Sequence, residues 1–152
     1  MSVSSFLSPA VSGGDGSIGS LGDIVFHVSS PRDILTIDNY GRDIKARLAS
    51  HEIIGSKPLT EFLGADTQSL SFSIKLNAYR GVNPREEMAR LVEYAETGEV
   101  LTLVLGGRAI GEHKWLIESV KEDVDIFDFD GVILASTASI TLREYVERRS
   151  WK

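Results

Sequence analysis

The stretch from Ser69 to Ala78 alternates apolar and polar residues without a break. In an extended chain, successive side chains point to opposite sides. One side of this stretch would therefore carry Leu70, Phe72, Ile74, Leu76 and Ala78, and the other would carry Ser69, Ser71, Ser73, Lys75 and Asn77. A helix repeats every 3.6 residues and would scatter these positions around its axis. The sequence thus predicts a β-strand with one dry face and one polar face.

Weaker runs of the same period predict further strands. They cover residues 21–28, 34–38, 46–54, 58–63, 114–120, 124–127 and 132–146. The nearly all-apolar run 100–105 predicts a strand that is buried on both faces. Pro58 favours an edge position for its strand, because proline cannot donate a backbone hydrogen bond. Asp130-Gly131 is typical of a hairpin turn between the last two strands. The final strand is so long that we expect it to be extended or bent.

A single helix is predicted over about residues 84–97. Asn83 is a preferred N-cap whose side chain accepts hydrogen bonds from first-turn amides, and Pro84 fits the first helical position, where its missing N–H costs nothing. Apolar residues then recur at i, i+3, i+4 and i+7 in Met88, Leu91, Val92 and Ala95. Gly98 supplies a left-handed stop. We expect this amphipathic helix to lie on the sheet and not to cross its middle.

The order of elements indicates an α+β domain that is mainly antiparallel β-sheet, because runs of strands precede and follow the one helix. Short connections such as the Gly106-Gly107 turn favour antiparallel neighbours. We expect a single domain over residues 21–152. Residues 1–20 are rich in serine and glycine, cannot bury apolar surface, and are predicted to be a flexible N-terminal arm.

The charge balance argues against nucleic-acid binding. Sixteen basic and 22 acidic residues give a formal net charge of −6, which repels phosphates. No stretch approaches the ~20 apolar residues that a membrane helix needs, and the N-terminus lacks the order of a signal peptide. The chain has no cysteine, which excludes disulfides, thiolate zinc sites and cysteine nucleophiles. We expect no specific nucleic-acid binding and no membrane anchoring.

Two motifs resemble ligand sites, but each lacks positions that the chemistry needs. Gly106-Gly107 opens a glycine-rich loop after a strand, yet neither a lysine–serine pair nor a helix start follows to receive a phosphate, so a tight hairpin is favoured. The acidic group over residues 122–130 places Ile126 and Thr137 where a calcium loop needs its first and last ligands. This group is predicted to be solvated turn carboxylates, or a charged surface that faces a channel or a partner subunit.

The three histidines give no sign of a metal or catalytic centre. His27, His51 and His113 lie far apart in the sequence, and none has a second ligand at metal spacing. We therefore predict no catalytic, no cofactor-binding and no metal-binding residues, and the chain is not predicted to be an enzyme.

Four short blocks, taken in order, make the chain resemble a known family. They are GSLGDIVF from Gly19, HEIIGSKP from His51, GVNPR from Gly81 and LGGR from Leu105, with Gly111 and Trp115 after the last. With these blocks the chain resembles the phage tail protein U family, the gpU-like tail proteins of contractile phages and R-type tailocins. The resemblance runs from about Ile18 to Val146. Residues 1–17 precede the usual beginning of the family.

The resemblance implies a non-enzymatic tail protein with a tail-tube-like fold, a β-barrel or sandwich with one flanking helix. It implies a hexameric ring that extends or initiates the tail tube and joins it to the baseplate hub. The tail tube protein and the hub or spike proteins would be its partners. Such a ring would belong to the virion or tailocin tail and would be assembled in the cytoplasm of the bacterial host.

Two alternatives remain open at this point. One is a tail terminator or completion ring at the head-proximal end. The other is a small ligand-binding β-barrel, which would need an apolar cavity.

A ring subunit needs two different surfaces, since each copy meets one neighbour on either side. Open strand edges meet this need by continuing the sheet between copies, and the long final strand and an unpaired hairpin are our candidates. We expect the inner wall of the ring to be a continuous sheet whose polar side lines the channel with Ser69, Ser71, Ser73 and Asn77. Negative charge suits such a conduit, because DNA phosphates would not adhere to it.

Overall fold

The computed structural model describes residues 17–27 and 36–147 of the chain. In chain order its elements are β1 (Ser17–Leu21), β2 (Ile24–His27), β3 (Thr36–Asp43), β4 (Ala46–His51), β5 (Leu59–Ala65), β6 (Ser69–Asn77), the 3-10 helix η1 (Ala78–Arg80), α2 (Pro84–Thr97), β7 (Leu103–Leu105), β8 (Arg108–Ala109), β9 (Lys114–Phe127) and β10 (Ile133–Tyr145). All strand pairings within the described residues are antiparallel.

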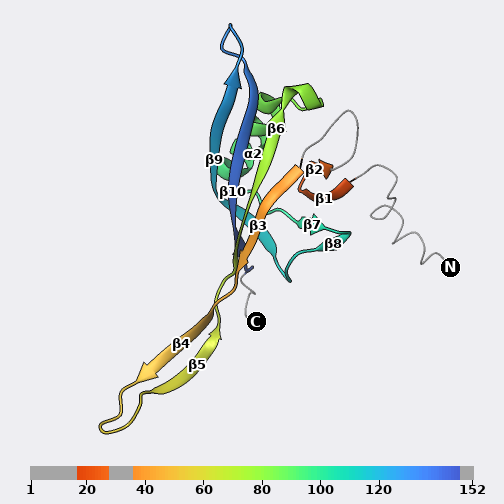
Figure 1. The fold of residues 1–152 in the computed structure, drawn as a ribbon. Coiled ribbons are helices and arrows are strands. Elements are labelled where there is room, and N and C mark those ends of the chain that lie inside the picture. The colour runs from red at the N-terminus through yellow and green to blue at the C-terminus, as the bar shows by residue number, and fades with distance from the viewer. Residues whose placement is uncertain (1–16, 28–35, 148–152) are drawn as a thin grey trace, which may run out of the picture.

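The larger sheet has the strand order β3-β6-β10-β9 (Figure 1). β6 contains the alternation from Ser69 to Asn77, and its large apolar residues are buried while the side chains between them are exposed or half-buried. Ala78, which we expected on the dry face, is exposed and begins η1. The long final strand β10 pairs with β6 on one side and β9 on the other, so it does not provide the open edge that we expected of it. The two outer strands of this sheet are β3 and β9, and the β9 edge is open except at Trp115, which exchanges two backbone hydrogen bonds with Leu101.

β9 runs as one strand where two were predicted. Exposed Lys121 and Asp123 alternate with half-buried Val120, Glu122 and Val124, so the charged residues continue the period of two. Acidic residues favour turns, but on the exposed side of an edge strand their charges stay in water and the strand is not interrupted.

α2 occupies the residues 84–97 that the pattern predicted. The Asn83 side chain accepts hydrogen bonds from the amides of Arg85 and Glu86, at 3.1 and 3.4 Å. Gly98 ends the helix with a left-handed φ of 67°. Within the part of the chain that the structure describes, no helix is long and apolar enough to cross a membrane.

One hydrophobic core joins the helix to both main sheets. Its largest fully buried side chains include Leu21, Phe26, Phe72, Leu91, Leu103, Trp115 and Ile140. Trp115 is fully buried, and its indole N–H donates to the Ile110 carbonyl oxygen at 2.8 Å. The Tyr94 hydroxyl lies 3.3 Å from both the amide and the carboxylate of Asp23 and so ties α2 to the β1–β2 turn.

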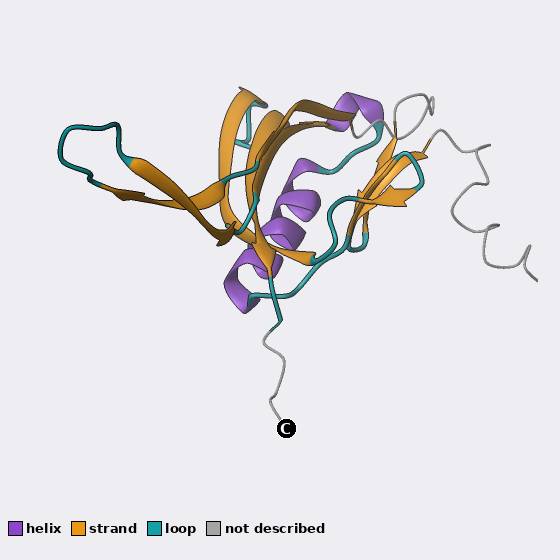
Figure 2. Cartoon of the chain, turned by 90° about the horizontal axis from the view of Figure 1, so that it is seen from below, coloured by secondary structure: helices purple, strands orange, loops and turns teal. Residues whose placement is uncertain are grey.

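The α+β class with mainly antiparallel sheet is confirmed, but the sheets do not close into the barrel that we offered as one form of this fold. β3 and β9 stay at opposite edges of the larger sheet. Figure 2 shows α2 on the concave side of that sheet, between it and the smaller sheet of order β2-β1-β7-β8. The helix therefore lies between two sheet layers and not on the outside of a closed barrel.

Residues 17–20, which we expected in the flexible arm, form β1 and pair with both β2 and β7. Gly19 permits this pairing, because a Cβ atom there would lie 2.1 Å from the Val104 carbonyl oxygen. A serine- and glycine-rich segment therefore serves here as a closely packed strand. The rest of the arm, residues 1–16, lies outside the described residues, and its flexibility stays a prediction.

β4 and β5 form a two-stranded sheet of their own, which projects from the body beyond the end of β3 (Figure 1). β5 pairs on one side only, in agreement with the edge position that Pro58 favoured. No residue from 44 to 65 is buried. This hairpin therefore contributes nothing to the core of the isolated chain.

Candidate functional site

The outward side of the larger sheet is polar from edge to edge, and we call it the polar face. Directly opposite residues of antiparallel strands share a side of the sheet. Ser73, for example, lies between Asp38 on β3 and Ser139 on β10. The members of the polar face are Asp38, Gly41, Asp43, Ser69, Ser71, Ser73, Lys75, Leu116, Ser119, Lys121, Asp123, Thr137, Ser139, Thr141 and Arg143. All of them except Gly41 and Leu116 carry hydroxyl or charged groups.

Three of the four residues predicted to face a channel lie together on the polar face. Ser71 is exposed, and Ser69 and Ser73 are half-buried between the neighbouring strands. Asn77 sits at the end of β6, where its side-chain oxygen accepts the amide of Tyr79 at 2.9 Å and caps η1. The role of Asn77 is therefore local, whereas the serines belong to a continuous surface.

The cations of the polar face are each matched by a carboxylate. Lys75 lies 3.4 Å from Asp38, and Lys121 lies 3.8 Å from Asp123. Arg143 lies 2.5 Å from the carboxylate of Glu118, which projects from the same strand as Lys121. These exposed pairs add little stability. They do leave a surface on which positive charge is neutralised locally and hydroxyl groups fill the space between the pairs.

The two outer edges of the larger sheet are suited to each other. Since each pairing in the order β3-β6-β10-β9 is antiparallel, strand direction alternates across the sheet. β9 and β3 therefore run in opposite directions. A second copy in the same orientation can place its β3 beside β9 and continue the antiparallel sheet, because the alternation is kept across the junction.

Exposed apolar side chains gather on two parts of the molecule. The first is the projecting hairpin, residues 44–65, with Ile44, Leu48, Ile53, Ile54, Leu59, Phe62 and Leu63. The second is the acidic tip, residues 122–132 at the β9–β10 turn, with Ile126, Phe127, Phe129 and Val132. We did not predict from the sequence that these side chains form a surface. One signal was present: adjacent apolar pairs such as Ile53-Ile54 and Phe62-Leu63 cannot both face one core from a strand.

The loops that resembled ligand sites have structural roles. Gly106 and Gly107 form the β7–β8 turn with φ of 61° and 79°, as the hairpin interpretation predicted. The Asp128 carboxylate accepts the amides of Asp130 and Val132, at 2.8 and 2.9 Å, and so fixes the β9–β10 turn. Over residues 17–27 and 36–147, no three His, Cys, Asp or Glu side chains converge as metal ligands would.

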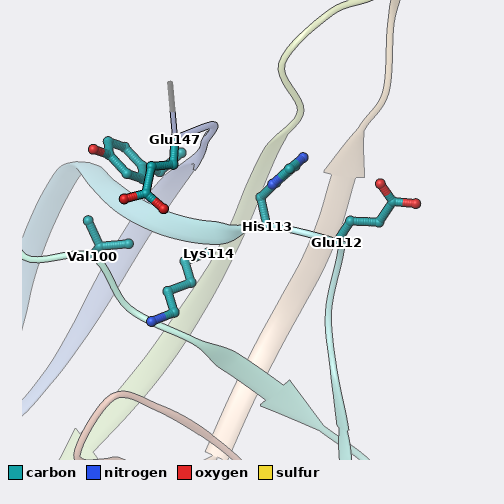
Figure 3. Close-up of a pocket in the computed structure, with 6 residues that line it drawn as sticks. Val100, Glu112, His113, Lys114 and Glu147 are labelled. Atoms are coloured by element: carbon teal, nitrogen blue, oxygen red, sulfur yellow. The ribbon is translucent and has the colours of Figure 1, made fainter. Parts of the chain in front are cut away.

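A shallow hollow of about 350 Å³ lies beside the start of β9 (Figure 3). It is lined by Val100, Glu112, His113, Lys114, Tyr145 and Glu147. Three of these residues, Glu112, Lys114 and Glu147, are charged, whereas a small apolar ligand needs an apolar, enclosed pocket. This hollow does not support the ligand-binding alternative.

Comparison with known proteins gives one family match. The model of the family described as Phage P2 GpU matches residues 22–147. No curated protein matches the chain. Among solved structures, a chain from the "Virion of native gene transfer agent (GTA) particle" is similar, with 13% sequence identity and a TM-score of 0.43, over 88% of this chain and 94% of that chain.

Proposed function

The chain belongs to the Phage P2 GpU family and is a structural protein of a phage-type tail, and we propose that it works there as a closed ring of identical copies. The ring would be a hexamer that extends or initiates the tail tube and joins it to the baseplate hub. The number six and the position in the tail come from the resemblance to gpU-like tail proteins. The observation that supports a ring is that the larger sheet has two outer strands, β3 and β9, which run in opposite directions.

The ring closes by adding β9 of one copy to β3 of the next. Each copy then uses two different edges, as a head-to-tail ring requires. Exposed strand edges are otherwise a hazard, because their unpaired N–H and C=O groups recruit other strands. Pairing within the ring satisfies those groups, so this arrangement removes the hazard and closes the assembly in one step.

The polar face lines the channel of the ring. α2 and the smaller sheet cover the other side of the larger sheet, so the polar face is the side left free to form an inner wall (Figure 2). Ser71 and Ser73 offer hydroxyl groups, while Lys75 and Lys121 are already paired with carboxylates. Such a wall has little net attraction for phosphates, which fits passage of DNA or protein without binding.

The same proposal assigns no catalysis to the chain. The candidate motifs are turns and caps, and the hollow of Figure 3 is a polar surface depression. The tail tube protein and the baseplate hub or spike proteins would be the neighbours at the two ends of the ring assembly. Assembly would take place in the cytoplasm of the bacterial host, in a phage or a tailocin.

The absence of cysteine allows a direct test of the channel wall. We compare Ser71→Cys on the polar face with Glu96→Cys on the exposed side of α2, using a maleimide linked to a polymer too large for the channel. Both positions are exposed, so both variants should react fast as isolated chains. In native tails stripped of their outer layer, Ser71→Cys should react at least ten times more slowly, while Glu96→Cys should keep its rate. Equal rates in the tail would rule out the polar face as the wall.

A further inference from the structure

The projecting hairpin exposes more apolar surface than an isolated element tolerates. Ile54 is fully exposed, and Leu48, Leu59 and Phe62 are each about 60% exposed or more. A two-stranded hairpin alone is only marginally stable in water, and clustered exposed apolar side chains mark a surface that a partner covers. Nothing else in residues 17–27 and 36–147 covers this hairpin, since β4 and β5 pair only with each other.

The acidic tip has the same apolar character. Phe129 is fully exposed, and Phe127 and Val132 are more than half exposed. Unlike the hairpin, the tip is held in one shape, because Asp128 fixes its turn through two amide hydrogen bonds. It therefore presents a preformed apolar surface to a partner.

The two surfaces differ in charge: the acidic tip is strongly negative, whereas the hairpin is close to neutral, with Lys45 paired to Asp43 at 3.3 Å. Residues 122–132 contain five acids, Glu122, Asp123, Asp125, Asp128 and Asp130, and no lysine or arginine. Residues 44–65 contain three cations, Lys45, Arg47 and Lys57, against the two acids Glu52 and Glu61. The formal charges are thus −5 and +1 in a chain whose total is −6. The hairpin is the more basic of the two surfaces, and apolar groups flanked by complementary charge are typical of specific interfaces.

The two surfaces lie at opposite ends of the molecule. In Figure 1 the β9–β10 turn is at the top and the β4–β5 hairpin is at the bottom. They cannot meet within one chain. Copies that follow one another along the strand direction of the larger sheet, however, bring the hairpin of one to the tip of the next. Such a head-to-tail contact uses a different surface on each copy.

We propose that the projecting hairpin of one copy binds the acidic tip of another copy that is stacked on it along the sheet axis. The contact buries Phe62 and Ile54 of the hairpin against Phe127 and Phe129 of the tip. Arg47 and Lys57 lie next to the carboxylates of the tip. This inference rests on the proposed ring: edge pairing of β9 and β3 joins copies around the ring, and the hairpin joins one ring to the next.

Single cysteines in a chain that has none test the contact by disulfide formation. Ser56→Cys lies in the hairpin loop, Val132→Cys lies in the tip, and Glu96→Cys on α2 is the exposed control. The two cysteine variants carry tags of different mass and are mixed. Native mass spectrometry of the same mixture shows whether rings form. The mixture of Ser56→Cys with Val132→Cys should give at least tenfold more mixed disulfide than either variant mixed with Glu96→Cys.

Charge reversal separates a specific contact from random collision. Arg47→Glu with Lys57→Glu should reduce the mixed disulfide at least fivefold, and Asp125→Lys with Asp130→Lys on the partner should restore it. A mixed disulfide no more abundant than the control overturns the stacking contact. If rings still form in that sample, the stacking contact is wrong but the proposed ring stands. If no rings form either, the proposed ring is wrong as well.

Discussion

Phe62 and Phe72 lie on consecutive strands, β5 and β6, but in opposite surroundings. Phe72 is 2% exposed and packs edge-to-face on Phe26 with ring centroids 5.9 Å apart, whereas Phe62 is 67% exposed. Phe72→Ala should therefore cost about 3–5 kcal/mol of unfolding free energy through lost burial and a cavity. Phe62 keeps only about a third of its side chain out of water, so Phe62→Ala should cost roughly 0.5–1 kcal/mol.

Thermal unfolding of the isolated chain measures this difference. For a chain of this size, 1 kcal/mol shifts the melting temperature by about 2–4 °C, so Phe72→Ala should lower it by roughly 6–20 °C and Phe62→Ala by roughly 1–4 °C. In stacked assemblies, Phe62→Ala should weaken the contact between stacked copies although each chain stays folded. Equal losses of unfolding free energy for the two variants of the isolated chain would show that the hairpin packs on its own body and is not an uncovered surface.

Three further substitutions test the elements that hold the body together. Leu91→Asp places a charge in the buried face of α2 and should leave the chain unfolded, as circular dichroism would report; a folded, soluble variant would contradict the position of the helix. Asn83→Ala removes the N-cap and should cost about 1 kcal/mol in denaturant unfolding, while Asn83→Ser should retain most of the stability. Asp128→Ala frees the amides of Asp130 and Val132 and should cost about 1 kcal/mol, with faster amide hydrogen exchange confined to the β9–β10 turn; unchanged exchange there would mean that the carboxylate does not fix the turn.

Local signals in the sequence predicted the local structure well. The alternation from Ser69 identified β6 and its two faces, and Asn83 with Gly98 identified both ends of α2. The Gly106-Gly107 turn followed in the same way, because each of these features depends on residues close in the chain. The fold class could be inferred from the order of such elements.

Partner strands and exposure could not be inferred in this way. Nothing local distinguishes β10, which is paired on both sides, from an edge strand, so the expected open edge was misplaced. The serine- and glycine-rich residues 17–20 resemble a flexible segment, and only the close approach of Gly19 to Val104 shows why they form a strand. The projecting hairpin has strand-like apolar residues that would ordinarily indicate a core position. Its exposure depends on where the rest of the sheet ends.

We propose that copies of the same chain complete the backbone edges at β3 and β9, and a cryo-electron microscopy map of the native tail would show whether they do. We expect a closed ring in which β9 of each copy pairs antiparallel with β3 of the next, with Ser71 and Ser73 on the inner wall. A map in which this chain touches no like neighbour, or in which β3 and β9 face solvent, would contradict it.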